Sequence, residues 1–394
     1  MSAAATIIVD FGSSSVKAGT ASESLPSLIF PSVVGVPAKK TGLIRRNKLA
    51  QDASPLAPFV VGAEALHEMH RATLHHPIQH GIVKDWPRME QIIHHTFTEF
   101  GLNAEETSLV CTESLFTPKS CSEQLAELLF GAFDVASLAF IPSGICSLYA
   151  SGRTTGIVLD SGDGVTQVTP VYDSYIIRNA ANRFNHGGQD VTEHLRTLLF
   201  ERGLNFTSPQ DRLTVKGIKE RLCYVSPVYE KELHEEEKQH LFALPDGQEV
   251  HIGREAFRAP EILFSPHITM LELPSMQDFV VDAVKGCSID IRKNMLSSII
   301  LSGGNTMFMG FASRLAEEVL KEFPGLFGTA KVIDAPDRLY SVWSGASVLA
   351  GLASFSEQLV TRDVFDENGP GIIHSYGHST MTGDEEELSA EEGR

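Results

Sequence analysis

The chain carries the same strand-and-turn design twice, first over residues 6–15 and again over residues 156–166. In each copy a short apolar run leads to an aspartate, Asp10 or Asp160, and then to a tight turn of glycine and small hydroxyl residues. Apolar runs of this length are typical of buried strands, and such turns connect them to a second strand. A repeat of this kind predicts a duplicated domain whose two halves face each other.

Turns built from glycine and serine favour the binding of an anion. Successive backbone N–H groups in such a turn approach the anion closely and form a concave nest. Two facing turns can therefore hold one polyphosphate from both sides. Asp10 and Asp160 repel phosphate, but their carboxylates suit a Mg²⁺ ion held through water beside it. One such turn alone is usually only a β-turn, so the prediction of a nucleotide with magnesium depends on the two together.

The length and composition indicate an ordinary globular protein. A chain of 394 residues exceeds what one core usually serves, so we expect two domains. No apolar run reaches membrane-spanning length and the N-terminus lacks the basic region of a signal peptide, so we expect a cytoplasmic protein without membrane insertion, with the nucleus as a second compartment. The five cysteines show no C-x-x-C spacing, which favours reduced thiols over a zinc site.

The net charge of −18 argues against sequence-independent binding of nucleic acid, because that affinity comes largely from Lys and Arg on phosphates. Part of the acidic excess lies at the end of the chain, over residues 379–394. We expect a disordered, solvated tail there, with docking to a basic partner as the minority interpretation.

Alternating strands and helices predict an α/β sheet. Strands are expected at 109–111, 138–141 and 297–301, and the segment 31–65 is expected to be a loop-rich excursion. Helices are expected over 86–100, 122–133, 188–200, 211–224, 229–239 and 303–323, the last opened by a Gly-Gly turn that favours anions at its N-terminus.

The string Ser147-Leu-Tyr-Ala-Ser-Gly-Arg-Thr-Thr-Gly156, followed by Asp160-Ser-Gly-Asp-Gly164, resembles actin and the actin-related proteins. The resemblance covers residues 6–374, and other segments agree in order, at 10–19, 77–81, 201–203, 218–224, 244–247, 290–293, 302–304 and 340–343. It implies the fold shared by actin, sugar kinases and the Hsp70 ATPase domain, with ATP or ADP and Mg²⁺ in a cleft between two α/β domains. The implied organisation is a first domain over 1–148 with a mobile loop at 36–61, a second over 149–340 with an insertion at about 188–270, a return to the first over 341–378, and the tail.

The resemblance also implies a nucleotide site, position by position. The first phosphate loop is Gly12, Ser13, Ser14 and Ser15, with Lys17 reaching the phosphates, and the second is Gly162, Asp163, Gly164 and Val165. Asp10 and Asp160 order the waters of the magnesium ion. The ribose and base are lined by Gly188, Lys216, Lys219, Glu220, Gly303, Gly304, Met307 and Phe308. By themselves Lys219 and Glu220 read as a surface charge pair and Phe308 as a core residue, so only the joint pattern supports this site.

Several positions depart from the family pattern. The common Asn-Gly-Ser-Gly of the first loop reads Phe11-Gly12-Ser13-Ser14, which adds a Cβ where the backbone approaches phosphate. Within the predicted catalytic set of Asp160, Ser143 and Gln167, Ser143 stands where actin carries the glutamine that orients the attacking water, and Gln167 replaces a nearby histidine. Phosphoryl transfer depends chiefly on positioning, so hydrolysis is expected to be impaired. An adenine-flanking lysine is also missing, with Leu339 there.

The surfaces that make filaments are retained in part. A groove that receives amphipathic partner helices is implied at Tyr149, Gly152, Thr154, Tyr175, Leu349 and Leu352, although Ser174 and Gln358 replace the family's glycine and methionine. The loop at 36–61 is longer than in actin, and residues 267–274 occupy the region that contacts the opposite strand. A head-to-tail contact between subunits needs two complementary surfaces, and the sequence of at least one of them differs from that of actin.

Three functions remain open at this point. The first is a filament-forming cytoskeletal actin. The second is a non-polymerising actin-related subunit of a dynactin-like, axonemal or chromatin-remodelling complex, with ATP as a structural ligand. The third is a small-molecule kinase of the same superfamily. We find no insertion that carries a catalytic base for a kinase. The rewritten loop favours the second possibility over conventional polymerisation. In either of the first two, the partners are other actin-like or complex subunits.

Overall fold

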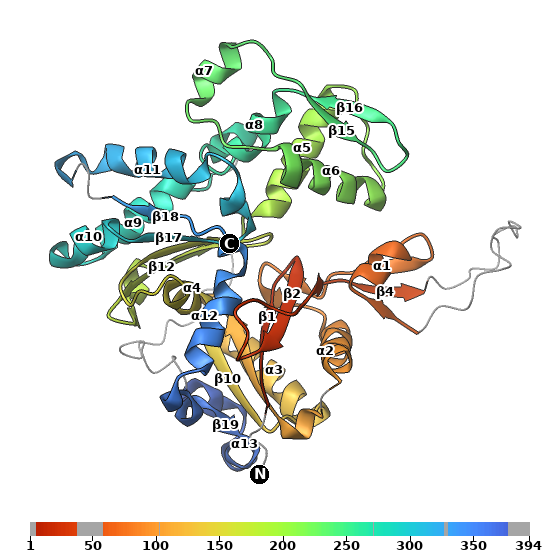
Figure 1. The fold of residues 1–394 in the computed structure, drawn as a ribbon, viewed down its shortest axis with the longest axis vertical. Helices are drawn as coiled ribbons and strands as arrows, with labels where there is room; N and C mark the ends of the chain where they lie inside the picture. The colour runs from red at the N-terminus through yellow and green to blue at the C-terminus, as the bar shows by residue number, and fades with distance from the viewer. Residues whose placement is uncertain (1–4, 38–57, 102, 271, 327–329, 377–394) are drawn as a thin grey trace, which may run out of the picture.

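The computed structural model describes residues 5–37, 58–101, 103–270, 272–326 and 330–376. Within them lie two mixed six-stranded sheets, one in each half of the molecule (Figure 1). The first sheet has the order β19-β10-β9-β1-β2-β3, with strands β1 (Ala5–Phe11), β2 (Ser15–Thr20), β3 (Leu28–Pro31), β9 (Thr107–Glu113), β10 (Ser137–Pro142) and β19 (Val360–Thr361). The predicted alternation of strands and helices is confirmed.

The second sheet has the order β13-β12-β11-β17-β18, and β14 pairs with β12. Its strands are β11 (Gly156–Ser161), β12 (Thr166–Tyr172), β13 (Tyr175–Ile176), β14 (Asn182–Phe184), β17 (Ile299–Ser302) and β18 (Val332–Ile333). The two sheets repeat one pairing, because β1 lies antiparallel to β2 and parallel to β9, as β11 does to β12 and β17. The predicted duplication is therefore present in the structure.

Helices cover both sheets. Beside the first sheet lie α2 (Trp86–Phe100), α3 (Lys119–Ala132) and α13 (Arg362–Asn368), and beside the second lie α9 (Met276–Gly286), α10 (Ile289–Leu296) and α11 (Phe311–Glu322). The upper part in Figure 1 is formed by α5 (Gly188–Glu201), α6 (Pro209–Leu222), α7 (Tyr229–His234), α8 (Glu255–Glu261) and the hairpin of β15 (His240–Ala243) and β16 (Glu249–Ile252).

A small sheet projects to the right of the first sheet in Figure 1. It contains β4 (Val34–Pro37), β5 (Val60–Val61) and β6 (Ala72–His75), with α1 (Ala63–His67) beside it. The ends of the segment expected to be a loop therefore form strands, because Val33, Val60 and Ala65 share a small buried core. Most of the predicted mobile loop, residues 38–57, and the whole of the predicted tail lie outside the described residues.

Two helices connect the halves. The helix α4 (Ser143–Ala150) follows β10, and α12 (Ser341–Ala350) crosses it between the two sheets. The crossing is close, since a Cβ built on Gly345 would lie 1.7 Å from the carbonyl oxygen of Cys146. Trp343 is fully buried there and its Nε1 donates to the Ile8 carbonyl at 3.0 Å. Through these contacts, α4 and α12 hold the two sheets in a fixed arrangement relative to each other.

Two of the expected helices differ from the structure. The helix expected over 303–323 is broken, because residues 304–307 form a 3₁₀ turn and α11 begins only at Phe311. Gly310 between them has a φ of 86°, a left-handed value that an α-helix cannot contain. The charged helix expected over 229–239 ends at His234, since the next residue, Glu235, adopts an extended conformation.

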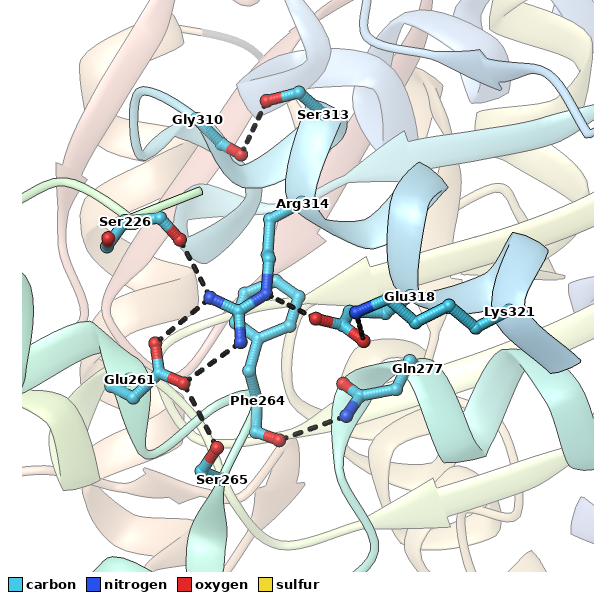
Figure 2. A network of polar contacts seen from close by, with 10 residues as sticks. All are labelled: Ser226, Glu261, Phe264, Ser265, Gln277, Gly310, Ser313, Arg314, Glu318 and Lys321. Carbon is cyan, nitrogen blue, oxygen red and sulfur yellow. Dashed lines mark hydrogen bonds and ion pairs between the residues drawn. The ribbon is translucent and has the colours of Figure 1, made fainter. Parts of the chain in front are cut away.

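A buried ionic network anchors the upper part to the second sheet's helices (Figure 2). Arg314, on α11, donates through Nη2 to Glu261 on α8 at 3.2 Å, through Nη1 to the Ser226 carbonyl at 2.7 Å and through Nε to Glu318 at 2.8 Å. Its guanidinium also lies 5.2 Å from the centre of the Phe264 ring. Glu261 is only 1% exposed, and a buried carboxylate without a countercharge is strongly destabilising, so the arginine is needed to stabilise its charged form.

Candidate functional site

A cleft of about 1020 Å³ lies between the two sheets, where the carboxyl ends of β1, β9, β10, β11 and β17 meet. Two of the predicted site residues, Gly188 and Gln167, do not line it. The cleft is lined by the others, namely Asp10, Gly12, Ser13, Ser14, Ser15, Lys17, Ser143, Asp160, Gly162, Asp163, Gly164, Val165, Lys216, Lys219, Glu220, Gly303, Gly304, Met307 and Phe308.

The two predicted phosphate turns have the same local structure. The Gly12 amide donates to the Ser15 carbonyl at 3.2 Å, and the Gly162 amide donates to the Val165 carbonyl at 2.9 Å. In the first turn, a Cβ on Gly12 would lie 2.8 Å from the Ser15 oxygen, so a side chain there would disturb the turn. Each turn therefore folds the backbone tightly directly after the strand that carries the aspartate.

The turns also face each other. A Cβ built on Gly164 would lie 2.9 Å from Ser13 Oγ and 3.1 Å from the amide nitrogen of His80. Both neighbours are held in place, because Ser13 Oγ accepts from the Gly81 amide at 2.8 Å and His80 Nδ1 contacts the Gly164 carbonyl at 2.6 Å. The two turns can approach this closely because Gly164 has no side chain.

The first carboxylate is held by neighbours from its own half. Asp10 accepts from Lys17 Nζ at 2.8 Å and from Thr112 Oγ1 at 2.6 Å. Burial alone would lower the pKa of Lys17, but the carboxylates of Asp10 and Asp160 raise it overall. The lysine therefore stays charged, with Asp10 as its countercharge.

The second carboxylate is more deeply enclosed. Burial raises the pKa of Asp160, and the hydrogen bond from Gln167 partly offsets that rise. Within the described part of the chain, no group of three or more His, Cys, Asp or Glu side chains could hold a metal ion. Two separate carboxylates fit a Mg²⁺ ion that keeps several waters and takes its other ligands from phosphate oxygens.

Gln167, which stands in the predicted catalytic set where the family carries a histidine, is tied into the protein. It is 1% exposed, and its Nε2 donates to Asp160 at 2.8 Å and to Ser143 Oγ at 2.6 Å. Its Oε1 accepts from the Leu115 amide at 2.7 Å. A glutamine has only two N–H donors, so none remains for a water. The structure thus places this side chain under the carboxylate and away from the cleft.

The predicted ribose and base residues lie at the other end of the cleft. Lys219 is 5% exposed; burial lowers its pKa, and its Nζ donates to the Gly188 carbonyl at 2.8 Å. Gly188 thus lies outside the cleft lining and supports it twice, through this carbonyl and through its amide, which donates to the Gly162 carbonyl at 2.9 Å. Gly303 has a φ of 84° and a Cβ there would lie 2.3 Å from the Ser161 carbonyl oxygen, so only glycine fits.

Three supporting residues escaped the sequence analysis. Asn305 donates to the Gly162 carbonyl at 3.0 Å, and Arg338 donates to the Thr306 carbonyl at 2.8 Å, so both hold the Gly-Gly turn. Thr112 contacts Asp10. Their only signal in the sequence is position, since Asn305 follows Gly303-Gly304 and Thr112 follows a predicted strand.

The actin family model matches residues 1–378 of the chain. This protein belongs to the actin family. The match covers the chain except for its last residues, and it confirms the predicted actin-like fold of two α/β halves around a cleft. None of the helices in the described ranges of this actin-family protein is both long and apolar enough to cross a membrane.

The groove predicted for partner helices is only partly exposed in this actin-family chain. Tyr175 is 55% exposed and Leu352 is 48% exposed, and the Tyr149 hydroxyl lies 2.9 Å from Ser174 Oγ. Gly152 follows α4 with a φ of 69°, and the Thr154 carbonyl accepts from the Ser174 amide. Leu349, however, is 1% exposed in the core beside α4, so its assignment to the groove surface is corrected.

Proposed function

We propose that this actin-family protein binds ATP or ADP with Mg²⁺ in the cleft between its two sheets. The proposal is supported above all by the two turns, which share one internal hydrogen bond and face each other at Gly164 and Ser13. Actin-fold proteins generally bind such nucleotides. The backbone amides of both turns and Lys17 would hold the phosphates, while Asp10 and Asp160 would hold the waters of the ion, which neutralises phosphate charge when bound.

A ligand that bridges the two halves stabilises only the folded protein. At a concentration of 100 times its Kd, Mg-ATP is expected to add about 2.7 kcal/mol to the free energy of unfolding. Thermal melting of the nucleotide-free protein checks this, with adenosine as the control because it lacks the phosphates. The melting temperature should rise with Mg-ATP and fall back when EDTA removes the metal. Equal melting temperatures with and without Mg-ATP would contradict the proposal.

We also propose that hydrolysis is slow and that Gln167 acts on Asp160 instead of on water. Replacing Gln167 by leucine removes the donor to Asp160, so the magnesium-dependent affinity for ATP should fall about 10-fold, as for other partners of metal-site ligands. Ser143→Ala is the matched control, because it removes one contact of Gln167 and leaves the bond to Asp160. If Gln167→Leu binds Mg-ATP with unchanged affinity but hydrolyses it more slowly in a single turnover, Gln167 orients the attacking water and the proposal is wrong.

We infer that the protein acts through association with actin-like or other subunits, in keeping with its family. The exposed side chains of Tyr175 and Leu352 support a contact at that end of α12. A filament and a subunit of a larger complex differ in what purified protein does alone. Sedimentation in magnesium and salt distinguishes them, because only a filament former enters the pellet without partners. We expect the protein to stay in the supernatant, and pelleted filaments would contradict that expectation.

A further inference from the structure

A hydrogen bond between side chains spans the cleft. Lys216, on α6 in the upper part, places its Nζ 2.6 Å from the Oγ of Ser14 in the first phosphate turn. The two residues belong to opposite halves of the molecule and both line the cleft. Resemblance to actin implies that Lys216 lies with the ribose and base, but the structure places its ammonium on the phosphate turn.

The other two lysines of the cleft have partners that hold them. Lys17 forms an ion pair with Asp10, and Lys219 is buried against the Gly188 carbonyl. Lys216 instead contacts a neutral hydroxyl, which takes up one of the three donors of an ammonium group. A phosphate oxygen is a stronger partner for this ammonium than the hydroxyl, because its negative charge adds a Coulomb attraction to the hydrogen bond.

A further cation, Arg212, lies near Lys216. Burial lowers the pKa of His76, and the charges of Arg212 and Lys216 lower it further, so both lie within electrostatic reach of that ring. Arg212 is paired with Glu193 at 2.8 Å, and Asp163 is the carboxylate that opposes these charges at His76. Because Glu193 pairs with Arg212, Lys216 is the one of these two cations that is left to interact with an anion at the phosphate turn.

We propose that Ser14 and Lys216 form a clasp that closes the cleft and reads the charge of the phosphate chain of the bound nucleotide. The inference rests on the proposed nucleotide site and deepens it. The ammonium donates to Ser14 Oγ, and with nucleotide it also donates to phosphate oxygens over the same turn. Each additional phosphate charge strengthens that contact and leaves the adenosine contacts unchanged. Lys216 is thus a specificity-determining residue for nucleoside polyphosphates.

The test measures the affinities of the full chain for ATP, ADP and AMP, each with magnesium. In Lys216→Met the affinity for ATP should fall about tenfold, that for ADP less and that for AMP least, as expected for loss of a hydrogen bond to a charged group. Lys216→Arg should retain the ATP affinity because it keeps the charge. Lys231→Met is the matched control, since it removes a lysine of the same upper part that is 75% exposed.

The outcomes separate the clasp from the nucleotide site itself. A loss in Lys216→Met that is equal for ATP, ADP and AMP would assign Lys216 to the ribose or base and overturn the clasp. An unchanged ATP affinity would overturn it as well, while leaving the nucleotide site standing. If the unsubstituted protein binds none of the three nucleotides, both proposals fail.

A second measurement needs no nucleotide. In the empty protein, Ser14→Ala and Lys216→Met remove the same hydrogen bond, so their effects on the melting temperature should not add. The double variant should therefore melt close to the lower of the two single variants. Strictly additive changes would show that the two side chains are uncoupled and would overturn the clasp.

Discussion

Replacing Arg314 by methionine is expected to lower the free energy of unfolding by about 3–5 kcal/mol. The change keeps most of the apolar stem but leaves Glu261, which is 1% exposed, without its countercharge. It also removes the donors to the Ser226 carbonyl and to Glu318 shown in Figure 2. Denaturant unfolding measures the loss. Glu261 lies on α8, in the upper part that also contains α6 and Lys216. We therefore expect this part to unfold first in the variant.

A matched control separates the buried ion pair from an ordinary one. Lys285 lies 3.5 Å from Glu322 and both side chains are about half exposed, so Lys285→Met should cost less than about 1 kcal/mol. If Arg314→Met costs no more than this control, the network is not what anchors the upper part.

The cost of losing Arg314 should also depend on pH. Burial raises the pKa of Glu261 above its ordinary 4.5, and Arg314 limits that rise. A carboxyl whose folded pKa is raised contributes stability below the unfolded pKa and loses it as pH rises through the folded value. The loss in Arg314→Met should therefore be smallest below pH 4.5, where Glu261 is neutral in both states, and largest above its folded pKa. A loss that is the same at all pH values would contradict this explanation.

Valine at Gly164 is expected to weaken ATP binding about 100-fold, because forcing extra atoms into a closely packed contact costs up to about 3 kcal/mol. Its Cβ would lie 2.9 Å from Ser13 Oγ and 3.1 Å from the His80 amide nitrogen, so it would force the two phosphate turns apart. Neither neighbour can retreat without losing its own hydrogen bond to Gly81 or to the Gly164 carbonyl. Titration calorimetry with Mg-ATP measures the affinity.

The same substitution at another glycine provides the control. Gly131 lies on α3, and a Cβ there meets nothing within 4 Å, so Gly131→Val should bind ATP as the unsubstituted protein does. Equal affinities in the two variants would show that the approach of the turns does not matter for the ligand.

The parts of the fold that the sequence predicts well are those set by local pattern. An apolar run, an aspartate and a glycine turn specify a hairpin within about 15 residues, and both copies form as expected at β1–β2 and β11–β12. The helix expected over 303–323 is wrong because the conformation of Gly310 depends on its packing against the Val225 carbonyl. Leu349 was misplaced for a similar reason, since its burial is decided by the crossing of α4 and α12.

Contacts between distant parts of the chain carry no local signal. Gln167 reaches Leu115 from 52 positions away, and Lys216 reaches Ser14 from 202 positions away. A motif can name these residues as members of one site, but only the fold shows which of their polar groups are already bonded. That is why the sequence could place Gln167 in the catalytic set and Lys216 with the ribose and base, but could not show that Gln167 bonds to a carboxylate and Lys216 to a phosphate turn.

The most direct test of a nucleotide held between the two halves is calorimetric titration of the nucleotide-free protein with Mg-ATP. We expect saturable binding of one nucleotide per chain, weaker when EDTA removes the magnesium, nearly lost in Gly164→Val and retained in Gly131→Val. Folded, unsubstituted protein that shows no binding heat and no rise in melting temperature with Mg-ATP would contradict the nucleotide site, and the clasp with it.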